Sequence, residues 1–292
     1  MVDEVLEFLS PRRGDKVLDA TIGCGGHAES ILQRIQPSGI LVGIDRDQSS
    51  LKIAKERLKD FDKLCRFAHA NFSGLDAVLS DLGMDAIDAA LFDLGISSFQ
   101  LDDPLRGFSF EKDGVLDMRM DPSESTRASD LVNRLSRDEL AGIIRDFGEE
   151  RYAGRIAAAI VERRKKEPIK TTVDLAGIVK RAVGRKYAGQ RLHPATRTFQ
   201  GIRIALNREL ENIETAMDKI TGFLGAGGRL CVISFHSLED RIIKNKFREF
   251  EKMGLGNIMT KKPVRPADNE TETNPRSRSA KLRAFTVLGR QG

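Results

Sequence analysis

A short glycine-rich stretch is the part of this chain best suited to bind a ligand. Gly23, Gly25 and Gly26 lie between an apolar segment and a segment with helical spacing, and residues 23–28 fit the pattern G-x-G-x-x-A. Glycine at such a turn lets the backbone approach a ligand because no Cβ stands in the way. The alternative is a tight strand-to-helix turn that binds nothing.

Three aspartates narrow the choice of ligand. Asp45 ends a second apolar segment 20 residues after Gly25, where a carboxylate can accept hydrogen bonds from both hydroxyls of an adenosine ribose. Asp19 precedes the glycine loop, where it would repel a pyrophosphate but suit a ligand that carries an amine and a sulfonium. Asp93 ends a later apolar segment, at the edge where open parallel sheets bind ligands. The three together favour S-adenosyl-L-methionine over a dinucleotide.

Strands that alternate with helices must position these residues. Over the first 93 residues the pattern predicts strands at 16–20, 40–44, 65–69 and 89–92, and helices at 28–35 and 49–58. This alternation predicts a parallel sheet covered on both faces. The second half predicts a helix with an apolar stripe from Leu210 to Leu224 that ends at residues 225–228, and then a buried strand at 229–235. Next we expect a helix at 237–250 that begins with a capping-box-like pair, Ser237 and Asp240. The last expected element is an antiparallel hairpin at the sheet edge, formed by residues 257–260 and 282–288.

The middle of the chain shows no strand pattern. Helical segments are expected at 128–133, 137–146, 153–164 and 173–183 within a helical insertion of about a hundred residues. Residues 151–210 contain 15 Lys and Arg against 4 Asp and Glu, whereas the whole chain has a net charge of only +5. A solvated helical face is the plain reading of a run such as residues 163–166. The whole segment favours a polyanionic partner, because phosphate contacts come from Lys and Arg.

Composition excludes several classes of protein. At 292 residues with 40% apolar and 31% charged residues, the chain has the composition of a globular protein. Its apolar stretches are far shorter than the roughly 20 residues of a membrane span, and we expect a cytosolic protein. Three cysteines without ligand spacing and four scattered histidines predict neither a disulfide framework nor a metal site.

Seven sequence blocks resemble one family. In chain order they are VLDATIGCGGH, DLGISS, RGFSF with DGVLDMRMD, FGEERYAGRIAAAI, RLHPATRTFQGIRIALNREL, GGRLCVISFHSLEDR and NPRSRSAKLRA. Over about 270 residues these blocks resemble the bacterial ribosomal RNA small subunit methyltransferase H family. One departure is the start of the chain, which lacks the short His-x-Pro-Val-type segment usual ahead of the first helix in this family.

The resemblance implies a fold, an activity and a set of cofactor contacts. It implies a class I, Rossmann-like α/β methyltransferase domain at 1–103 and 206–292, with an inserted all-helical substrate-recognition domain at 104–205. It implies N4-methylation of one cytidine in the decoding region of 16S ribosomal RNA, with S-adenosyl-L-methionine as cofactor and the small ribosomal subunit as partner. Besides Asp19 and Gly23, the expected cofactor contacts are Gly25, Gly26, His27, Asp45, Phe72, Asp93 and Gln100, with Phe72 near the adenine.

The chemistry requires an in-line displacement rather than a covalent nucleophile. The chain has no Pro-Cys pair of the kind that cytosine C5 methyltransferases use, so its cysteines are interpreted as packing or loop residues. The acidic or Asn residue followed by Pro-Pro-aromatic of many amino methyltransferases is replaced by Asp93-Leu94-Gly95-Ile96-Ser97-Ser98. We hypothesise that Asp93 contacts the cofactor as the catalytic carboxylate, while backbone carbonyls around residues 94–97 accept hydrogen bonds from N4.

The target base must leave its stack, which calls for a pocket and phosphate clamps. The residues expected to contact RNA are Arg106, Phe108, Phe110, Asp117, Arg119, His193, Arg197, Arg203 and His236. Each has a plainer interpretation: the two phenylalanines as apolar plugs, His193 as part of a turn, Arg119 as the partner of Asp117 or Asp121, and His236 as the cap of its own helix.

Two other functions are compatible with parts of the sequence. A nicotinamide-dependent oxidoreductase would use the same glycine loop and Asp45, although Asp19 and the seven blocks oppose it. An RNA-binding assembly factor without catalysis would keep the basic insertion, although the complete loop and carboxylates oppose this. The sequence leaves the oligomeric state open, and a homodimer is compatible with it.

Overall fold

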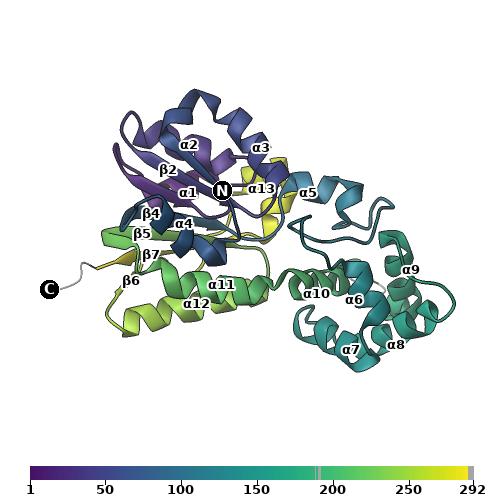
Figure 1. The fold of residues 1–292 in the computed structure, drawn as a ribbon. Coiled ribbons are helices and arrows are strands. Elements are labelled where there is room, and N and C mark those ends of the chain that lie inside the picture. Colours follow the sequence, from purple (N-terminus) through teal and green to yellow (C-terminus); the bar gives the residue numbers. More distant parts are fainter. Residues whose placement is uncertain (188, 190–191, 289–292) are drawn as a thin grey trace. The chain divides into compact units, whose positions relative to one another are not determined.

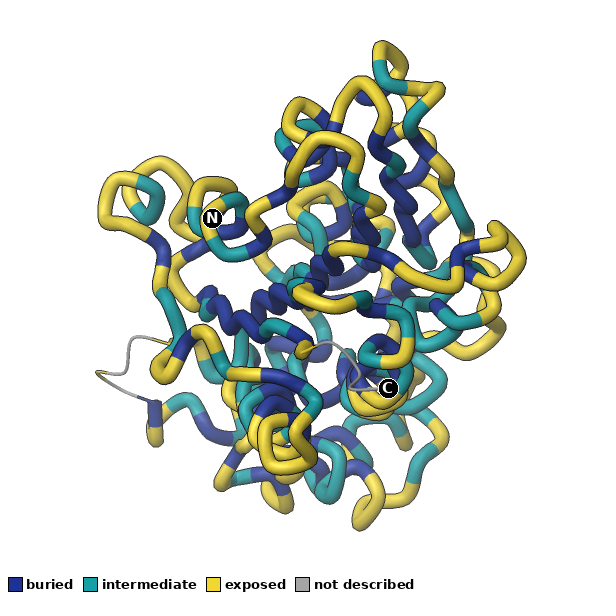
Figure 2. The backbone as a smooth tube through the Cα atoms, turned by 90° about the vertical axis from the view of Figure 1, so that its left-hand side faces the viewer, coloured by how far each residue is buried: buried dark blue, intermediate teal, exposed yellow. Residues whose placement is uncertain are grey.

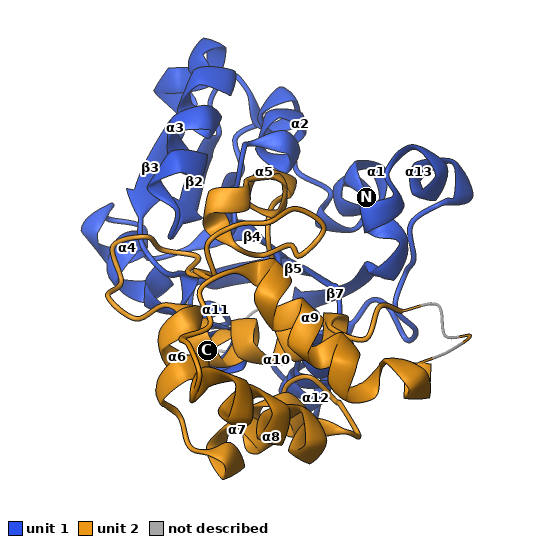
Figure 3. Cartoon of the chain, turned by 90° about the vertical axis from the view of Figure 1, so that its right-hand side faces the viewer, with its two compact units in different colours: residues 1–95, 210–292 blue, residues 96–209 orange. Residues whose placement is uncertain are grey.

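The chain divides into two compact units in the computed structural model, which describes residues 1–187, 189 and 192–288. The first unit comprises residues 1–95 and 210–292, and the second comprises residues 96–209 (Figure 3). The insertion predicted at 104–205 therefore lies inside the second unit. Arg191, which opens one of the seven sequence blocks, lies outside the described residues.

A seven-stranded sheet forms the first unit, in the order β3-β2-β1-β4-β5-β7-β6 (Figure 1). All neighbouring pairs are parallel except β5 with β7 and β7 with β6. The strands are β1 Lys16–Asp19, β2 Ile40–Asp45, β3 Cys65–His69, β4 Ile87–Asp93, β5 Leu224–Ser234, β6 Gly256–Ile258 and β7 Lys281–Val287. The predicted parallel sheet and the antiparallel edge hairpin are both confirmed.

Apolar side chains cover both faces of this sheet, as the continuous apolar strands predict. On one face, Leu18, Val42 and Phe92 pack with α4, α11 and α12. On the other face, Val17 and Leu41 pack with α1, α2 and α3. In Figure 2 the buried residues lie mainly along the inner parts of the tube and the exposed residues mainly along its outer turns. The helices of the unit are α1 Val2–Leu9, α2 Gly26–Ile35, α3 Gln48–Arg57, α4 Leu75–Asp81, α11 Glu209–Ile220, α12 Ser237–Lys252 and α13 Asp268–Thr273, with 3-10 helices η1 Lys59–Leu64, η2 Phe72–Gly74 and η5 Pro275–Ser279.

Two predicted element boundaries in this unit are wrong. The helix with the apolar stripe ends at Ile220 rather than at residues 225–228, and β5 already begins at Leu224. A register shift between Ile87 and Ala89 lets the glycines of residues 225–228 enter the strand. The helix after β5 begins with a capping box of His236 and Glu239 rather than with Ser237 and Asp240.

Helices alone form the second unit, with one isolated bridge between Val115 and Thr171 in its described part. All four predicted helices are present, and the missed α10 contains Phe199 and Ile202 in the same apolar core. The elements are α5 Ser98–Asp102, η3 Pro104–Arg106, α6 Ala128–Arg134, α7 Arg137–Asp146, α8 Ala153–Arg164, α9 Thr172–Val183, η4 Gly184–Tyr187 and α10 Thr196–Asn207. Among the described residues, no helix combines the length and the apolar character that crossing a membrane requires.

Candidate functional site

The candidate site lies where the strand order of the sheet reverses. The chain proceeds outward from β1 to β3 on one side and from β4 to β5 on the other, so β1 and β4 are neighbours at the switch point. Open α/β sheets bind ligands beyond the carboxyl ends of the strands at this point. Asp19 ends β1, Asp45 ends β2 and Asp93 ends β4, so the first unit brings all three predicted aspartates to this edge.

The glycine loop adopts backbone conformations that favour glycine. Gly23 and Gly25 have φ values of 51° and 83°, in the left-handed region. A Cβ on Gly25 would also lie 3.3 Å from Cδ1 of Leu58. Gly25 caps the N-terminus of α2 without a side-chain hydrogen bond, and Gly26 and His27 form its first turn. The first N–H groups of this helix therefore point toward the sheet edge as donors for an anionic group.

Thr21 joins two of the aspartates and was missed in the sequence. Its backbone N–H donates to Oδ1 of Asp19 at 3.2 Å, and its Oγ1 accepts from the backbone N–H of Asp93 at 2.6 Å. The side chain of Thr21 thus fixes the end of β4 relative to the loop after β1. A hydroxyl residue two positions after the first aspartate, within DATIGCGG, is the signal that identifies it.

Asp45 fixes two loops at once. Its Oδ2 accepts from the N–H of Gly23 at 2.8 Å, and its Oδ1 accepts from the N–H of Asp47 at 2.8 Å. Burial raises the pKa of Asp45 and these two hydrogen bonds oppose the rise. Each carboxylate oxygen can accept more than one hydrogen bond, so ribose hydroxyls can still bind there.

Asp19 is buried among like charges. Its exposed fraction is 1%, and burial is the main reason why its pKa is raised from 3.8 to about 7. His27 opposes the rise, whereas Asp93 and Asp45 add to it. Nε2 of His27 lies 3.5 Å from Oδ2 of Asp93. Burial by itself would lower the pKa of His27, but Asp93 and Asp19 outweigh burial and raise it.

Two further expected cofactor contacts lie in different units. Phe72 follows β3 in the first unit and packs edge-on against Phe92 of the sheet, with 5.8 Å between ring centroids. Asn71 caps its 3-10 helix, which holds the ring at the same strand edge. Gln100 belongs to the second unit, where it is buried and completes a capping box with Ser97. Its contact with the cofactor stays a prediction.

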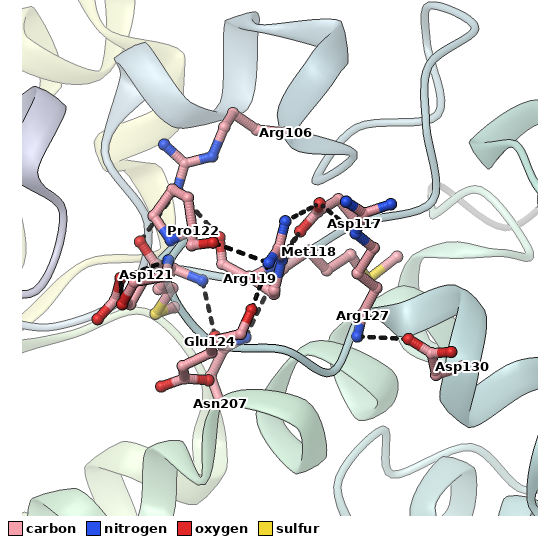
Figure 4. Close-up of polar contacts among 12 residues, drawn as sticks. Arg106, Asp117, Met118, Arg119, Asp121, Pro122, Glu124, Arg127, Asp130 and Asn207 are labelled. Carbon is pink, nitrogen blue, oxygen red and sulfur yellow. Dashed lines mark hydrogen bonds and ion pairs between the residues drawn. The ribbon is translucent and has the colours of Figure 1, made fainter.

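Several residues expected to contact RNA hold together a loop of the second unit (Figure 4). Nε and the second terminal nitrogen of Arg119 donate to the two carboxylate oxygens of Asp117, both at 2.8 Å, and its remaining nitrogen donates to the carbonyls of Pro122 and Glu124. Burial would raise the pKa of Asp117, but Arg119 and Arg127 outweigh it and lower that pKa. The plainer interpretation, in which Arg119 pairs with Asp117, is confirmed.

Arg106 and Asn207 complete this loop. Arg106 donates to the carbonyls of Arg119 and Met120 at 2.9 and 3.0 Å. The side-chain amide of Asn207 accepts from the N–H of Met120 at 2.8 Å and donates to the carbonyl of Met118 at 2.9 Å. Met118 has a φ of 59°, which few residues with a side chain adopt. The loop is therefore a preorganised scaffold whose carbonyls are bound by side chains.

An Asn207→Ala variant should have a free energy of unfolding about 2–4 kcal/mol lower than the wild type, because buried backbone groups of Met118 and Met120 lose their hydrogen-bond partners. Chemical denaturation monitored by circular dichroism, with limited proteolysis of the loop, measures this. Asn257→Ala, at an exposed position of β6, is the control and should change the free energy of unfolding by less than about 0.5 kcal/mol. Equal stability of the two variants would contradict the scaffold role of Asn207.

The remaining RNA candidates of the second unit differ in exposure. The half-buried ring of Phe110 lies 4.7 Å from the exposed ring of His193, whereas Phe108 is buried in the helical core. Burial and the charge of Lys180 lower the pKa of His193, so this imidazole is neutral near pH 7. Other side chains are engaged within the unit: Arg197 donates to the carbonyl of Glu149, and Arg203 forms a bidentate ion pair with Glu209.

His236 belongs to the first unit and caps its own helix. Its Nδ1 accepts from the N–H of Glu239 at 3.3 Å, and Glu239 accepts from the N–H of His236. The interpretation of His236 as a helix cap is confirmed. Cys65 and Cys231 are buried in the core, where burial raises the pKa of both thiols, and Cys24 lies in the glycine loop. The interpretation of the cysteines as packing and loop residues is confirmed as well.

Comparison with known proteins decides the family. The family model described as the MraW methylase family matches residues 1–288. The chain belongs to the MraW methylase family. Its relatives in the family include the protein named ribosomal RNA small subunit methyltransferase H of Geotalea uraniireducens, 50% identical over 97% of this chain and 96% of that protein. Proteins of the same name from Pelobacter propionicus (48% identity, 99% and 97% coverage) and Halothermothrix orenii (44%, 97% and 96%) are also similar.

Membership in this family confirms the resemblance, the fold and the cofactor. The sheet order with a reversed β7 is the class I methyltransferase arrangement. The cofactor is S-adenosyl-L-methionine, and the nicotinamide interpretation of the glycine loop is wrong.

The residues at the sheet edge suit this cofactor. Oδ1 of Asp93 and Nδ1 of His27 are buried and lack a hydrogen-bond partner among the described residues. Unsatisfied buried polar atoms are costly, so atoms of this kind mark a place for a ligand. Burial is the main cause of the raised pKa of Asp19, and the charges of Asp93 and Asp45 add to it, so a cation such as the sulfonium or the amine suits this edge. The N-terminus of α2 suits the carboxylate at the other end of the methionine moiety.

Proposed function

We propose that the chain methylates the exocyclic N4 of one cytidine in the decoding region of 16S ribosomal RNA. The observation that carries this proposal is the match along nearly the whole chain to proteins named ribosomal RNA small subunit methyltransferase H, which include relatives at 44–50% identity. The three aspartates at the switch point support the same conclusion because they suit a methyl donor with positive charge. The small ribosomal subunit is then the partner.

The side chains at the edge of the sheet have separable tasks in this proposal. S-adenosyl-L-methionine supplies a methyl group on a positively charged sulfur. Asp45 holds the ribose hydroxyls, Asp19 faces the positive charge, and Phe72 lies beside the adenine. The glycine loop gives its backbone N–H groups to the carboxylate. Positioning of this kind accounts for much of the rate acceleration in an in-line displacement, because the attacking atom must lie about 3–3.5 Å from the methyl carbon.

The acceptor nitrogen needs hydrogen-bond acceptors. The lone pair of cytosine N4 is delocalised into the ring, so acceptors on its two protons help the nitrogen pyramidalise and attack. Backbone carbonyls around residues 94–97 accept from N4, while Oδ1 of Asp93 is available at the end of β4. The N–H of Leu94 donates to the carbonyl of Ile233 at 3.0 Å, which keeps the start of this segment in line with the sheet.

We infer that the basic second unit recognises the RNA. The rings of Phe110 and His193 lie 4.7 Å apart and tilted by 30°, with His193 exposed, and Arg106 and Arg119 hold the loop that carries the exposed residues 122–127. Base stacking on a neutral ring and phosphate binding by the surplus of Lys and Arg are the two expected contributions.

Isotope-labelled methyl transfer into small ribosomal subunits tests the proposed function directly. Subunits from cells that lack this protein should accept one methyl group, and mass spectrometry of the nucleosides should identify N4-methylcytidine. Failure to transfer a methyl group while RNA still binds would support the second candidate, an assembly factor without catalysis. Transfer to another atom or another base would reject the proposed specificity and keep the methyltransferase.

An Asp93→Ala variant should lower turnover by about 10- to 100-fold, because hydrogen bonds to a charged group contribute about 1.5–3 kcal/mol. Single-turnover methyl transfer measures this. Asp88→Ala is the matched control, since Asp88 is an exposed carboxylate near the other end of the same strand. Normal turnover and normal cofactor affinity of Asp93→Ala would remove Asp93 from the mechanism.

A further inference from the structure

A second group of basic residues lies on the first unit, outside the basic segment that the sequence singles out. Two segments form it, the loop of residues 259–266 after β6 and the short 3-10 helix η5 before β7, and we call them the edge loops. Arg276 has a partner within the chain, and the other exposed cations of these segments are Lys261, Lys262, Arg265 and Arg278. No ion pair is found for these four side chains among the described residues, whereas nearby Lys281 and Arg283 are held by Asp240.

The strand register places the edge loops at the same edge of the sheet as the cofactor site, beyond the carboxyl ends of β4 and β5. Asp93 at the end of β4 pairs with Ile233 of β5, and the next residue of β5, Ser234, pairs with Lys281 at the start of β7. The adjoining Leu282 forms a bridge with Val264 of the first edge loop. The carboxyl ends of β4 and β5, the start of β7 and the first edge loop therefore follow one another along a single edge.

The spacing along this edge suits an extended nucleic-acid strand. Neighbouring strands lie about 4.8 Å apart, so three steps from β4 to the first edge loop cover roughly 14 Å. A few nucleotides span that distance. A strand with its target base at Asp93 would therefore bring a flanking phosphate to the edge loops.

The first edge loop is also preorganised. Lys262 and Arg265 each precede a proline, which restricts their backbone to extended conformations. Val264 and Leu282 exchange two backbone hydrogen bonds of 2.9 Å, and the side chain of Val264 packs on the core of the unit. Cations held on a fixed backbone lose less conformational freedom when they bind. Of the carboxylates between the two loops, Glu270 is engaged by the amino group of Met1.

We propose that the edge loops bind backbone phosphates of the RNA strand that flanks the target nucleotide. This proposal rests on the proposed function, since it takes ribosomal RNA as the substrate. It adds a contact surface in the methyltransferase unit to the one in the helical unit. Phosphate contacts position the substrate and contribute affinity that falls with salt, without reading sequence.

A triple variant of the full-length protein tests the edge loops. Lys261→Gln, Lys262→Gln and Arg265→Gln are combined, and Arg278→Gln is added in a second variant. The matched control combines Lys52→Gln, Arg248→Gln and Lys252→Gln, three exposed cations on helices of the same unit. The affinity for small ribosomal subunits that lack the methyl group is measured from about 50 to 200 mM salt.

The triple variant should bind the subunits at least tenfold more weakly than the wild type. The slope of its log affinity against log salt concentration should be less steep by about one for each phosphate contact that is lost. Its affinity for S-adenosyl-L-methionine, measured by calorimetry, should equal that of the wild type. The proposal is wrong if the triple variant behaves like the control. It is also wrong if the variant loses the subunit yet binds oligocytidine normally, because the partner would then be a ribosomal protein. A wild type that binds but does not methylate subunits would instead overturn the proposed function.

Discussion

At pH 8.5, an Asp19→Asn variant is expected to be more stable than the wild type and to bind S-adenosyl-L-methionine at least tenfold more weakly. Asp19 is buried with one backbone hydrogen bond, from Thr21, and its pKa of about 7 shows that the folded protein disfavours the charged form. Asparagine keeps the shape and the acceptor but removes the charge. The stability gained and the affinity lost thus have the same cause.

The sign of the stability change follows from proton binding. Between the ordinary pKa of 3.8 and the folded value of about 7, the folded state binds more protons than the unfolded state, so Asp19 lowers the free energy of unfolding as pH rises through this range. Above pH 7 the penalty reaches an upper limit of about 4 kcal/mol. His27 offsets part of it while protonated, so the gain from Asp19→Asn should grow as His27 loses its proton.

Thermal unfolding at pH 5 and pH 8.5 checks this prediction, with Asp85→Asn at an exposed position as the control. At pH 5 the folded protein keeps Asp19 protonated while the unfolded chain has ionised it, so only about a third of the full penalty is present and Asp19→Asn should unfold only slightly above the wild type. At pH 8.5 the variant should unfold several degrees higher. A variant that is less stable than the wild type at pH 8.5 would show that the charge of Asp19 is well compensated without a ligand.

Calorimetry across the same range of pH follows the affinity. The wild type should bind S-adenosyl-L-methionine more tightly as pH rises through 7, because ionised Asp19 attracts its positive charge. The affinity for S-adenosylhomocysteine, which lacks the charged sulfur, should rise less with pH. The ratio of the affinity for S-adenosyl-L-methionine to that for S-adenosylhomocysteine should therefore increase with pH. Asp19→Asn should remove most of that rise. An equal rise for both ligands would place the positive charge away from Asp19.

Replacing Asp45 with alanine is expected to weaken cofactor binding by more than 100-fold. The substitution removes the acceptor for two backbone N–H groups, those of Gly23 and Asp47, as well as the expected acceptor for the ribose hydroxyls. A buried group left without a partner costs about 1–3 kcal/mol, and two such groups loosen both loops at the site. The loss should therefore appear in affinity and in the order of the glycine loop.

Calorimetry and amide hydrogen exchange measure the two effects of Asp45→Ala. Amides of residues 21–26 should exchange faster in the variant without any ligand. Asp60→Ala, an exposed carboxylate in the same unit, should change neither quantity. Affinity within threefold of the wild type would mean that Asp45 does not hold the nucleoside.

Elements with one clear apolar pattern were predictable from the sequence. The β3 strand and helices α7 and α8 have the predicted bounds, and the other predicted strands except β5 differ by no more than two residues at either end. The three aspartates at the sheet edge were predictable for a related reason, because parallel strands end at a common edge. The proximity of side chains that follow such strands can therefore be predicted without knowledge of contacts between distant parts of the chain.

Other features depend on contacts that local patterns do not contain. The early start of β5 requires the register shift opposite Ile87, and the cap of α12 is a histidine, which is not among the preferred capping residues. The charge of Arg119 suggested a phosphate, yet its donors satisfy Asp117 and two loop carbonyls. A charged residue in a loop can thus stabilise the loop itself, and the sequence does not separate this role from ligand binding.

The interruption of the first unit by the second has a consequence for synthesis on the ribosome. Residues 94–223 separate β4 from β5, its neighbour in the sheet. At about 5–20 residues per second, a nascent chain makes these 130 residues in roughly 7–26 s. During that interval the backbone groups of β4 that later pair with β5 lack their hydrogen-bond partners, and the side chains of β4 are mostly apolar. The helical unit can fold before the sheet is complete. The sheet can therefore close only after the segment up to Ser234 has left the exit tunnel.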